Sequence, residues 1–200
     1  QLSDGICHYD LWRSGNAHTV VLIHGFSVPS HIWDPTFDFL AKSGFQVLRY
    51  DLFGRGFSDR PKTVYNIHLF VRQLKELLDA LEIRKPVHLA GLSMGGPIST
   101  VFIENFPERV HSHILIDPAG VKPVRLSWAL KALKLPLLPE LILGLFGGES
   151  LVKSIASDFF TSDLIEQFKA KYRIQMRYKG FLRAILSTVR NGMLDSFHET

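Results

Sequence analysis

The first 120 residues contain short apolar runs that are separated by turns and helical patterns. Four runs are rich in Val, Ile and Leu, and each one stops at a glycine or an aspartate. Their apolar density is typical of strands that are covered on both faces. The runs lie at residues 19–24, 46–50, 87–90 and 110–116, and a more exposed strand is expected at 7–12.

Helical patterns lie between these runs. Apolar residues recur at helical spacing from Ile67 to Leu81, and Asn66 is placed to cap the start of that helix. A second pattern begins at Ile98 and is ended by Pro107. Because strands and helices alternate, the sequence predicts an α/β fold with a doubly wound, mostly parallel sheet.

The alternation stops after about residue 120, and no convincing strand follows before residue 190. Asp163 with Glu166 three residues later is typical of a helix start, and the apolar residues from Phe181 to Val189 form a further helical face. An all-helical insertion above the sheet is therefore expected. The predicted division is a core over residues 1–120, a helical cap over 121–190, and the start of a return to the core over 191–200.

Charge is unevenly distributed along the chain, whose formal net charge is +4. Residues 1–120 carry −1, residues 121–190 carry +7 and the last ten residues carry −2. A solvated helix surface is the favoured interpretation of the basic segment, and weak contact with an anionic membrane surface is the alternative. No nucleic-acid-binding motif is present, so a nucleic-acid partner is not expected.

Neither disulfide bonding nor membrane insertion is indicated. Cys7 is the single cysteine, which excludes an internal disulfide. The most apolar segment, Leu135–Phe146, is far shorter than the ~20 residues that span a bilayer and contains two prolines. No secretory signal begins the chain, so a cytoplasmic location is favoured.

The strongest chemical signal is Gly91-Leu92-Ser93-Met94-Gly95. A serine on a sharp strand-to-helix turn has an exposed hydroxyl beside a helix N-terminus, and the turn leaves no room for side chains two residues to either side. An apolar run precedes this segment and a helical pattern follows it. Ser93 is therefore predicted to be a catalytic nucleophile.

A second segment, His24-Gly25-Phe26, directly follows a predicted strand. Acyl transfer develops negative charge on a carbonyl oxygen, and backbone N–H groups must already point at it. The amides of Phe26 and Met94 are the expected donors. Gly25 allows close backbone approach, and His24 is interpreted as a brace for this loop rather than as a base.

The motifs resemble those of the α/β-hydrolase family in order and spacing. The capped branch, which includes carboxylesterases, monoacylglycerol lipases and carbon–carbon bond hydrolases, is the most similar. A serine at position 93 weighs against the dehalogenases and epoxide hydrolases of this fold, which use aspartate there. The resemblance also implies that Asp51 and Arg55 bond local backbone. The matching segments are 24–26 with Trp33, 51–58, 91–96 and 106–110.

The resemblance also implies a catalytic acid and then a histidine on loops after late strands. Asp195 and His198 have the right order but lie three residues apart on one element, which cannot reproduce two loops. Asp117 ends a predicted strand at a position where a minority of the family carries the acid; a plain turn residue is the alternative. No histidine of this chain matches the family's position.

The favoured interpretation is a fragment of a longer hydrolase, with an exposed sheet edge and little esterase turnover of its own. The complete protein is expected to act on a small hydrophobic ester without a metal or other cofactor. Two alternatives remain open. One is a carbon–carbon bond hydrolase of ring-fission products, and the other is a non-catalytic scaffold that binds a ligand or partner.

Overall fold

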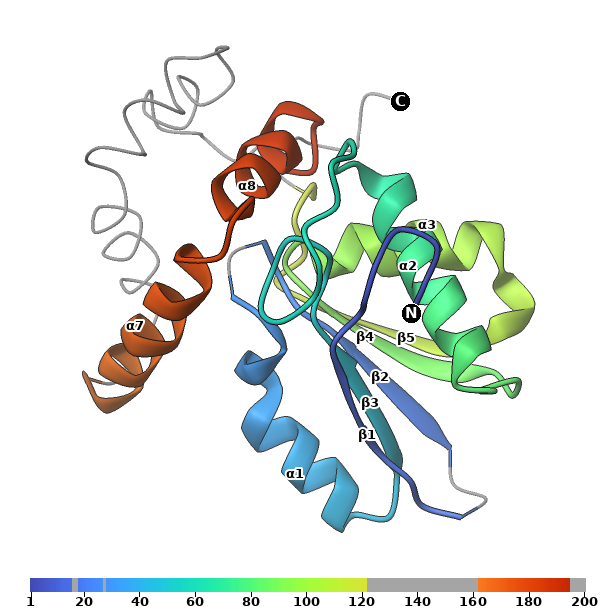
Figure 1. Ribbon diagram of the computed structural model, residues 1–200. Helices are drawn as coiled ribbons and strands as arrows, with labels where there is room; N and C mark the ends of the chain where they lie inside the picture. Colours follow the sequence, from blue (N-terminus) through green and yellow to red (C-terminus); the bar gives the residue numbers. More distant parts are fainter. Residues whose placement is uncertain (16–17, 27, 122–161, 195–200) are drawn as a thin grey trace.

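The computed structural model describes residues 1–15, 18–26, 28–121 and 162–194. Five strands form one sheet in the order β1-β3-β2-β4-β5 (Figure 1). β1 is antiparallel to β3, and the other neighbours are parallel. The strands are β1 (Tyr9–Trp12), β2 (Thr19–Ile23), β3 (Gln46–Tyr50), β4 (Val87–Leu92) and β5 (Val110–Ile116).

Helices cover both faces of the sheet, with α1 on one side and α2 and α3 on the other (Figure 1). Alternate residues of a strand point to opposite faces. Accordingly Val20 and Leu22 pack with α1, whereas Val21 and Ile23 pack with α2 and α3. The helices are α1 (Asp34–Lys42), α2 (Ile67–Ala80), α3 (Gly95–Asn105), α7 (Ser162–Met176) and α8 (Phe181–Arg190), with short 3₁₀ turns at Ser30–Trp33 and Pro107–Arg109.

The predicted α/β class and the mostly parallel sheet are confirmed. Asn66 caps α2, since its side-chain oxygen accepts a hydrogen bond from the Leu69 amide at 3.1 Å. No helix was predicted at α1, which begins with Asp34-Pro35 and packs Phe37 and Leu40 against the sheet.

The helices α7 and α8 lie within the predicted cap region. α8 buries most of one face, and its Ala184 belongs to the main core cluster. Tyr172 of α7 packs with Phe181 and Ile185 of α8 in a second apolar cluster. The segment Leu135–Phe146 and the pair Asp195 and His198 lie outside the described residues. None of the helices in the described parts of the chain is long and apolar enough to cross a membrane.

Candidate active site around Ser93

Ser93 lies on the turn between β4 and α3 in a backbone conformation that non-glycine residues seldom adopt, with φ of +50°. Its amide donates to the Ile116 carbonyl at 3.0 Å, and its carbonyl accepts from the amides of Gly96 and Ala119. Such strain persists only where the surroundings hold it, and it is concentrated at functional sites. The side chain is half-buried at the end of the sheet that carries the strands' C-termini.

The glycines on either side of Ser93 are required by the packing of this turn. A Cβ on Gly91 would lie 2.4 Å from the Gly95 carbonyl oxygen, and a Cβ on Gly95 would lie 2.4 Å from the Ile23 carbonyl oxygen. Both clashes are with backbone, which cannot swing aside as a flexible side chain could. The spacing of these glycines therefore follows from steric limits at a strand-to-helix turn.

The segment Gly25-Phe26 lies against Ser93. A Cβ on Gly25 would be 3.1 Å from Ser93 Cβ and 3.6 Å from Ser93 Oγ, so the backbone passes very close to the hydroxyl. The amides of Phe26 and Met94 donate no hydrogen bond to any other described residue. Buried or half-buried amides are nearly always paired, so two unpaired donors beside one serine suit a ligand oxygen.

His24 is fully buried, and backbone groups occupy both of its ring nitrogens. Nε2 accepts a hydrogen bond from the Leu52 amide at 2.9 Å, and Nδ1 lies 2.8 Å from the Gly25 carbonyl oxygen. Burial lowers the pKa of His24 to about 4, so the imidazole is neutral at pH 7 with its proton on Nδ1. This arrangement connects the ends of β2 and β3 and leaves no nitrogen for Ser93.

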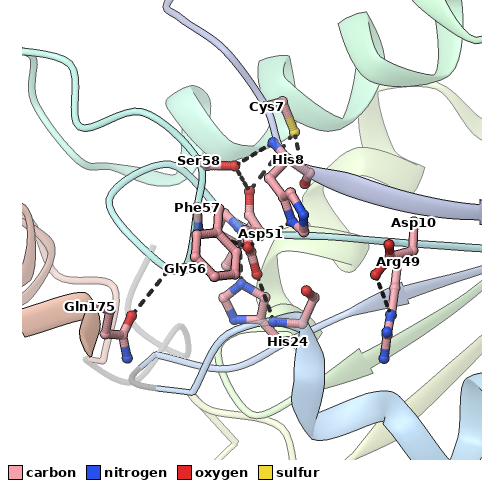
Figure 2. Close-up of polar contacts among 12 residues, drawn as sticks. Cys7, His8, Asp10, His24, Arg49, Asp51, Gly56, Phe57, Ser58 and Gln175 are labelled. Atoms are coloured by element: carbon pink, nitrogen blue, oxygen red, sulfur yellow. Dashed lines mark hydrogen bonds and ion pairs between the residues drawn. The ribbon is translucent and has the colours of Figure 1, made fainter. Parts of the chain in front are cut away.

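Asp51 organises the loops next to this serine, as Figure 2 shows. Its carboxylate accepts hydrogen bonds from the amides of Ser30 at 2.8 Å and Phe57 at 2.9 Å, and it lies 3.0 Å from His8 Nδ1. Burial alone would raise the pKa of Asp51. The His8 contact, the charge that His24 carries once it is protonated at low pH, and the two amide hydrogen bonds outweigh burial and hold the pKa of Asp51 well below its usual range.

Arg55 was expected to bond local backbone only, but its hydrogen bonds also reach more distant residues. One guanidinium nitrogen donates to the nearby Phe53 carbonyl, but another reaches the Phe26 carbonyl and a third reaches Thr188 on α8. The partner on α8 is 133 positions away in the chain. No local sequence signal identifies Thr188, so sequence reasoning missed this contact.

No histidine in the described parts of the chain hydrogen-bonds to Ser93. His113 Nε2 lies 2.7 Å from Ser99 Oγ. The Ser99 hydroxyl already donates its one hydrogen bond to the Gly96 carbonyl, so the His113 imidazole is the donor to Ser99 Oγ. Asp117 is exposed and has φ of +43° in the turn that hydrogen-bonds to the Ser93 backbone. The candidate acid therefore lies near Ser93, without a histidine between them among the described residues.

A cleft of about 280 Å³ opens beside this site, between α7 and the ends of β1 and β3. Neither Ser93 nor Phe26 lines it. Among the described residues, no group of three or more His, Cys, Asp or Glu side chains is arranged to hold a metal ion. The lining residues are His8, Asp10, Pro29, Ser30, His31, Asp34, Arg49, Asp51, Gly56, Phe57, Lys171, Ile174, Gln175 and Tyr178.

Residues 18–140 match the family model described as alpha/beta hydrolase fold. Monoacylglycerol lipase abhd6-B of Xenopus laevis is 31% identical over 146 residues, which cover 67% of this chain and 43% of that protein. An uncharacterized protein of Mycobacterium tuberculosis is 33% identical over 121 residues, which cover 60% of this chain and 35% of that protein. The chain thus spans less than half the length of these curated relatives.

Solved structures show the same fold over nearly the whole chain. Cfl2 of Burkholderia cenocepacia superposes with a TM-score of 0.78 at 25% identity, covering 92% of this chain and 66% of that one. The enol-lactonase of Burkholderia xenovorans LB400 gives a TM-score of 0.75 at 23% identity, covering 97% of this chain and 73% of that one.

Proposed function

The chain belongs to the alpha/beta hydrolase fold family, and we propose that it carries the nucleophile and the oxyanion-binding groups of a serine hydrolase that cleaves carboxylic esters with a hydrophobic acyl group. One observation carries the proposal. The strained Ser93 turn lies against Gly25-Phe26, and the amides of Phe26 and Met94 have no partner among the described residues. The name of the Xenopus relative, a monoacylglycerol lipase, supports an ester substrate.

In the proposed reaction, Ser93 Oγ attacks the acyl carbon, and the carbonyl oxygen becomes an oxyanion. The amides of Phe26 and Met94 stabilise this charge, because they are held in place before the reaction begins. Departure of the alcohol leaves an acyl group on Ser93, which water then releases as the acid. Phe26 and Val28 pack with the apolar cluster of α7 and α8, which suits a hydrophobic acyl chain nearby.

The proton of Ser93 requires a base, and the proposal assigns that role to none of the described histidines. His24 uses both ring nitrogens, and His113 donates to Ser99. Asp117 remains the candidate acid, because its turn is hydrogen-bonded to Ser93. The 200-residue chain by itself is therefore expected to turn over esters weakly.

The test compares two serines of this region in hydrolysis of p-nitrophenyl butyrate. It uses the 200-residue chain and the complete protein that its gene encodes. Ser93→Ala should reduce kcat of the complete protein by about 10³-fold or more, since a nucleophile is removed. Ser99→Ala is the matched control; it removes a buried hydroxyl on α3 and should keep activity within about tenfold, because neither of the hydrogen bonds that it removes, with Gly96 and His113, is made by the Ser93 side chain. Full activity in Ser93→Ala would falsify the proposal.

Two alternatives are outcomes of further assays on the same proteins. A carbon–carbon bond hydrolase would use the same serine, and it would show a higher kcat/KM on dienoic ring-fission acids than on esters. A non-catalytic scaffold is consistent with the lack of a described histidine beside Ser93. If the protein is such a scaffold, the complete protein would hydrolyse neither esters nor ring-fission acids and would still bind an ester analogue.

A further inference from the structure

Arg55 is a fully buried cation without a carboxylate partner among the described residues. Burying an unpaired charge is costly unless several hydrogen bonds compensate for the lost water. Burial lowers the pKa of Arg55 to about 10, which still leaves the guanidinium charged at neutral pH. Such a group is retained in a protein interior only when its hydrogen bonds hold it in place.

Three hydrogen bonds from Arg55 to described residues connect separate parts of the chain. Nε donates to the Phe26 carbonyl at 2.9 Å, Nη1 to the Phe53 carbonyl at 3.3 Å and Nη2 to Thr188 Oγ1 at 2.9 Å. The guanidinium also lies 5.3 Å from the centroid of the Phe26 ring. Because the guanidinium is planar and rigid, a shift of one nitrogen moves the others.

Thr188 is itself oriented by its helix. Its hydroxyl donates to the Ala184 carbonyl at 2.8 Å, so the oxygen presents its lone pairs to Arg55. α8 also reaches the core at other points. The Tyr65 amide donates to Ser187 Oγ at 3.1 Å, Arg183 donates to the Arg60 carbonyl at 2.6 Å, and a Cβ on Gly54 would lie 2.6 Å from Ala184 Cβ. None of these contacts involves Phe26.

We propose that Arg55 and Thr188 are positioning residues, through which the docking of α8 fixes the direction of the Phe26 amide. This inference rests on the proposed function, in which that amide is an oxyanion donor. The carbonyl that Arg55 holds and the amide that binds the oxyanion lie in adjacent peptide planes that meet at the Phe26 Cα, so holding the carbonyl limits rotation about the φ and ψ angles of Phe26 and thereby the direction of its amide. When α8 moves away, Arg55 loses one of its three acceptors, and the oxyanion donor loses its alignment.

Thr188→Val tests the coupling, because valine keeps the shape of threonine and removes the acceptor. Ser187→Ala is the matched control, since it removes a different hydrogen bond between α8 and the core, the one that the Tyr65 amide donates to Ser187 Oγ. The first readout is the ¹⁵N order parameter of the Phe26 amide in the 200-residue chain. A rigid backbone gives about 0.85. Thr188→Val should lower the value to about 0.6, which is the range of flexible backbone, and Ser187→Ala and Thr188→Ser should leave it unchanged.

The second readout is turnover by the complete protein. Thr188→Val should lower kcat about tenfold with KM within twofold, a smaller loss than removal of an oxyanion donor causes. Arg55→Lys should act in the same way, because an ammonium lacks the rigid fork that spaces separate donors to Phe26 and Thr188. It serves if Thr188→Val does not fold. An unchanged Phe26 order parameter in both variants, or an equal loss in Ser187→Ala, overturns the inference. The order parameter does not depend on catalysis, so a failure of the proposed function alone leaves this result intact.

Discussion

Asp51 and His8 form a half-exposed ion pair that connects the start of β1 to the loops beside Ser93. The Asp51 carboxylate, 3.0 Å from His8 Nδ1, raises the pKa of His8 above its ordinary value against the opposing effect of burial. When folding raises the pKa of a histidine, the stability that it contributes is fully present below the pKa of the unfolded chain, which is near 6.5. That stability is lost as pH rises through the pKa of the folded protein. The pair should therefore weaken as pH rises above about 6.5 and through the raised pKa of His8.

His8→Gln should destabilise the chain more at pH 5.5 than at pH 8. The difference is expected to be about 0.5 kcal/mol, since one partner is solvent-exposed. Urea unfolding of the unsubstituted chain and of His8→Gln at several pH values gives the free energy of unfolding of each. Their difference removes the opposite pH dependence that histidines with a lowered pKa, such as His24 and His31, contribute to both proteins. His68→Gln on the exposed face of α2 is the control. A constant effect of His8→Gln across this pH range would contradict the prediction.

Single residues could be predicted from the sequence where the constraint is local. The clash at Gly91 is with Gly95, four positions away, and the cap Asn66 acts on a residue three positions away. The clash at Gly95 is with Ile23 on β2, so the reason for that glycine is not local. The partners of Arg55 and Asp51 could not be predicted in this way. Thr188 and His8 reach them across long sequence separations, and each polar side chain has many possible partners until the fold brings one close.

Helices and strands, like single residues, could be predicted only where their own sequence determines them. Strands β2 to β4 were predicted because both of their faces are covered, which requires continuous apolar runs. β5 was predicted from the same kind of run, although most of its residues are exposed. α1 was missed because the helix is short, buries no residue fully and presents a weaker apolar face than α2 or α8. Its position depends on packing against the sheet more than on its own sequence pattern.

β5 is an edge strand with an apolar surface. Among the described residues it pairs only with β4, and Ile114, Leu115 and Ile116 are 50%, 46% and 40% exposed. Neighbouring residues of a strand point to opposite faces, so both faces of this edge are apolar. Unprotected edges of this kind pair with other chains. The 200-residue chain is expected to self-associate through β5.

Ile114→Lys should weaken this association about tenfold, since charged side chains protect natural sheet edges from pairing. Light scattering after size-exclusion chromatography over a range of concentrations gives the apparent dissociation constant. Phe39→Lys on α1 is the matched control, because Phe39 is 68% exposed and lies away from the sheet edge. If both substitutions weaken association equally, net charge and not the β5 edge controls it.

At the scale of the whole molecule, charge and exposed apolar groups meet on α7 and on the turn that follows it, residues 177–180. Residues 162–194 contain seven Lys or Arg and two Asp or Glu. Beside this charge, Ile174 and Tyr178 are exposed, and Phe57 of the core packs edge-on against Tyr178 with ring centroids 6.5 Å apart. Basic residues next to exposed aromatic and aliphatic groups favour the interface of an anionic membrane. We propose that this surface binds anionic lipid weakly.

The double substitution Arg177→Glu with Lys179→Glu should reduce co-flotation of the chain with vesicles of phosphatidylcholine and phosphatidylserine. Each cation near such a surface contributes about 1 kcal/mol, so reversing two charges should weaken binding by more than tenfold. The double substitution Lys42→Glu with Lys85→Glu makes the same change in net charge at exposed sites on other elements and should have a smaller effect. Equal losses in the two variants would show that net charge alone drives binding. If the chain floats equally well with vesicles of phosphatidylcholine alone, electrostatic attraction does not contribute to binding. Neutral vesicles lack the surface potential that attracts the basic residues.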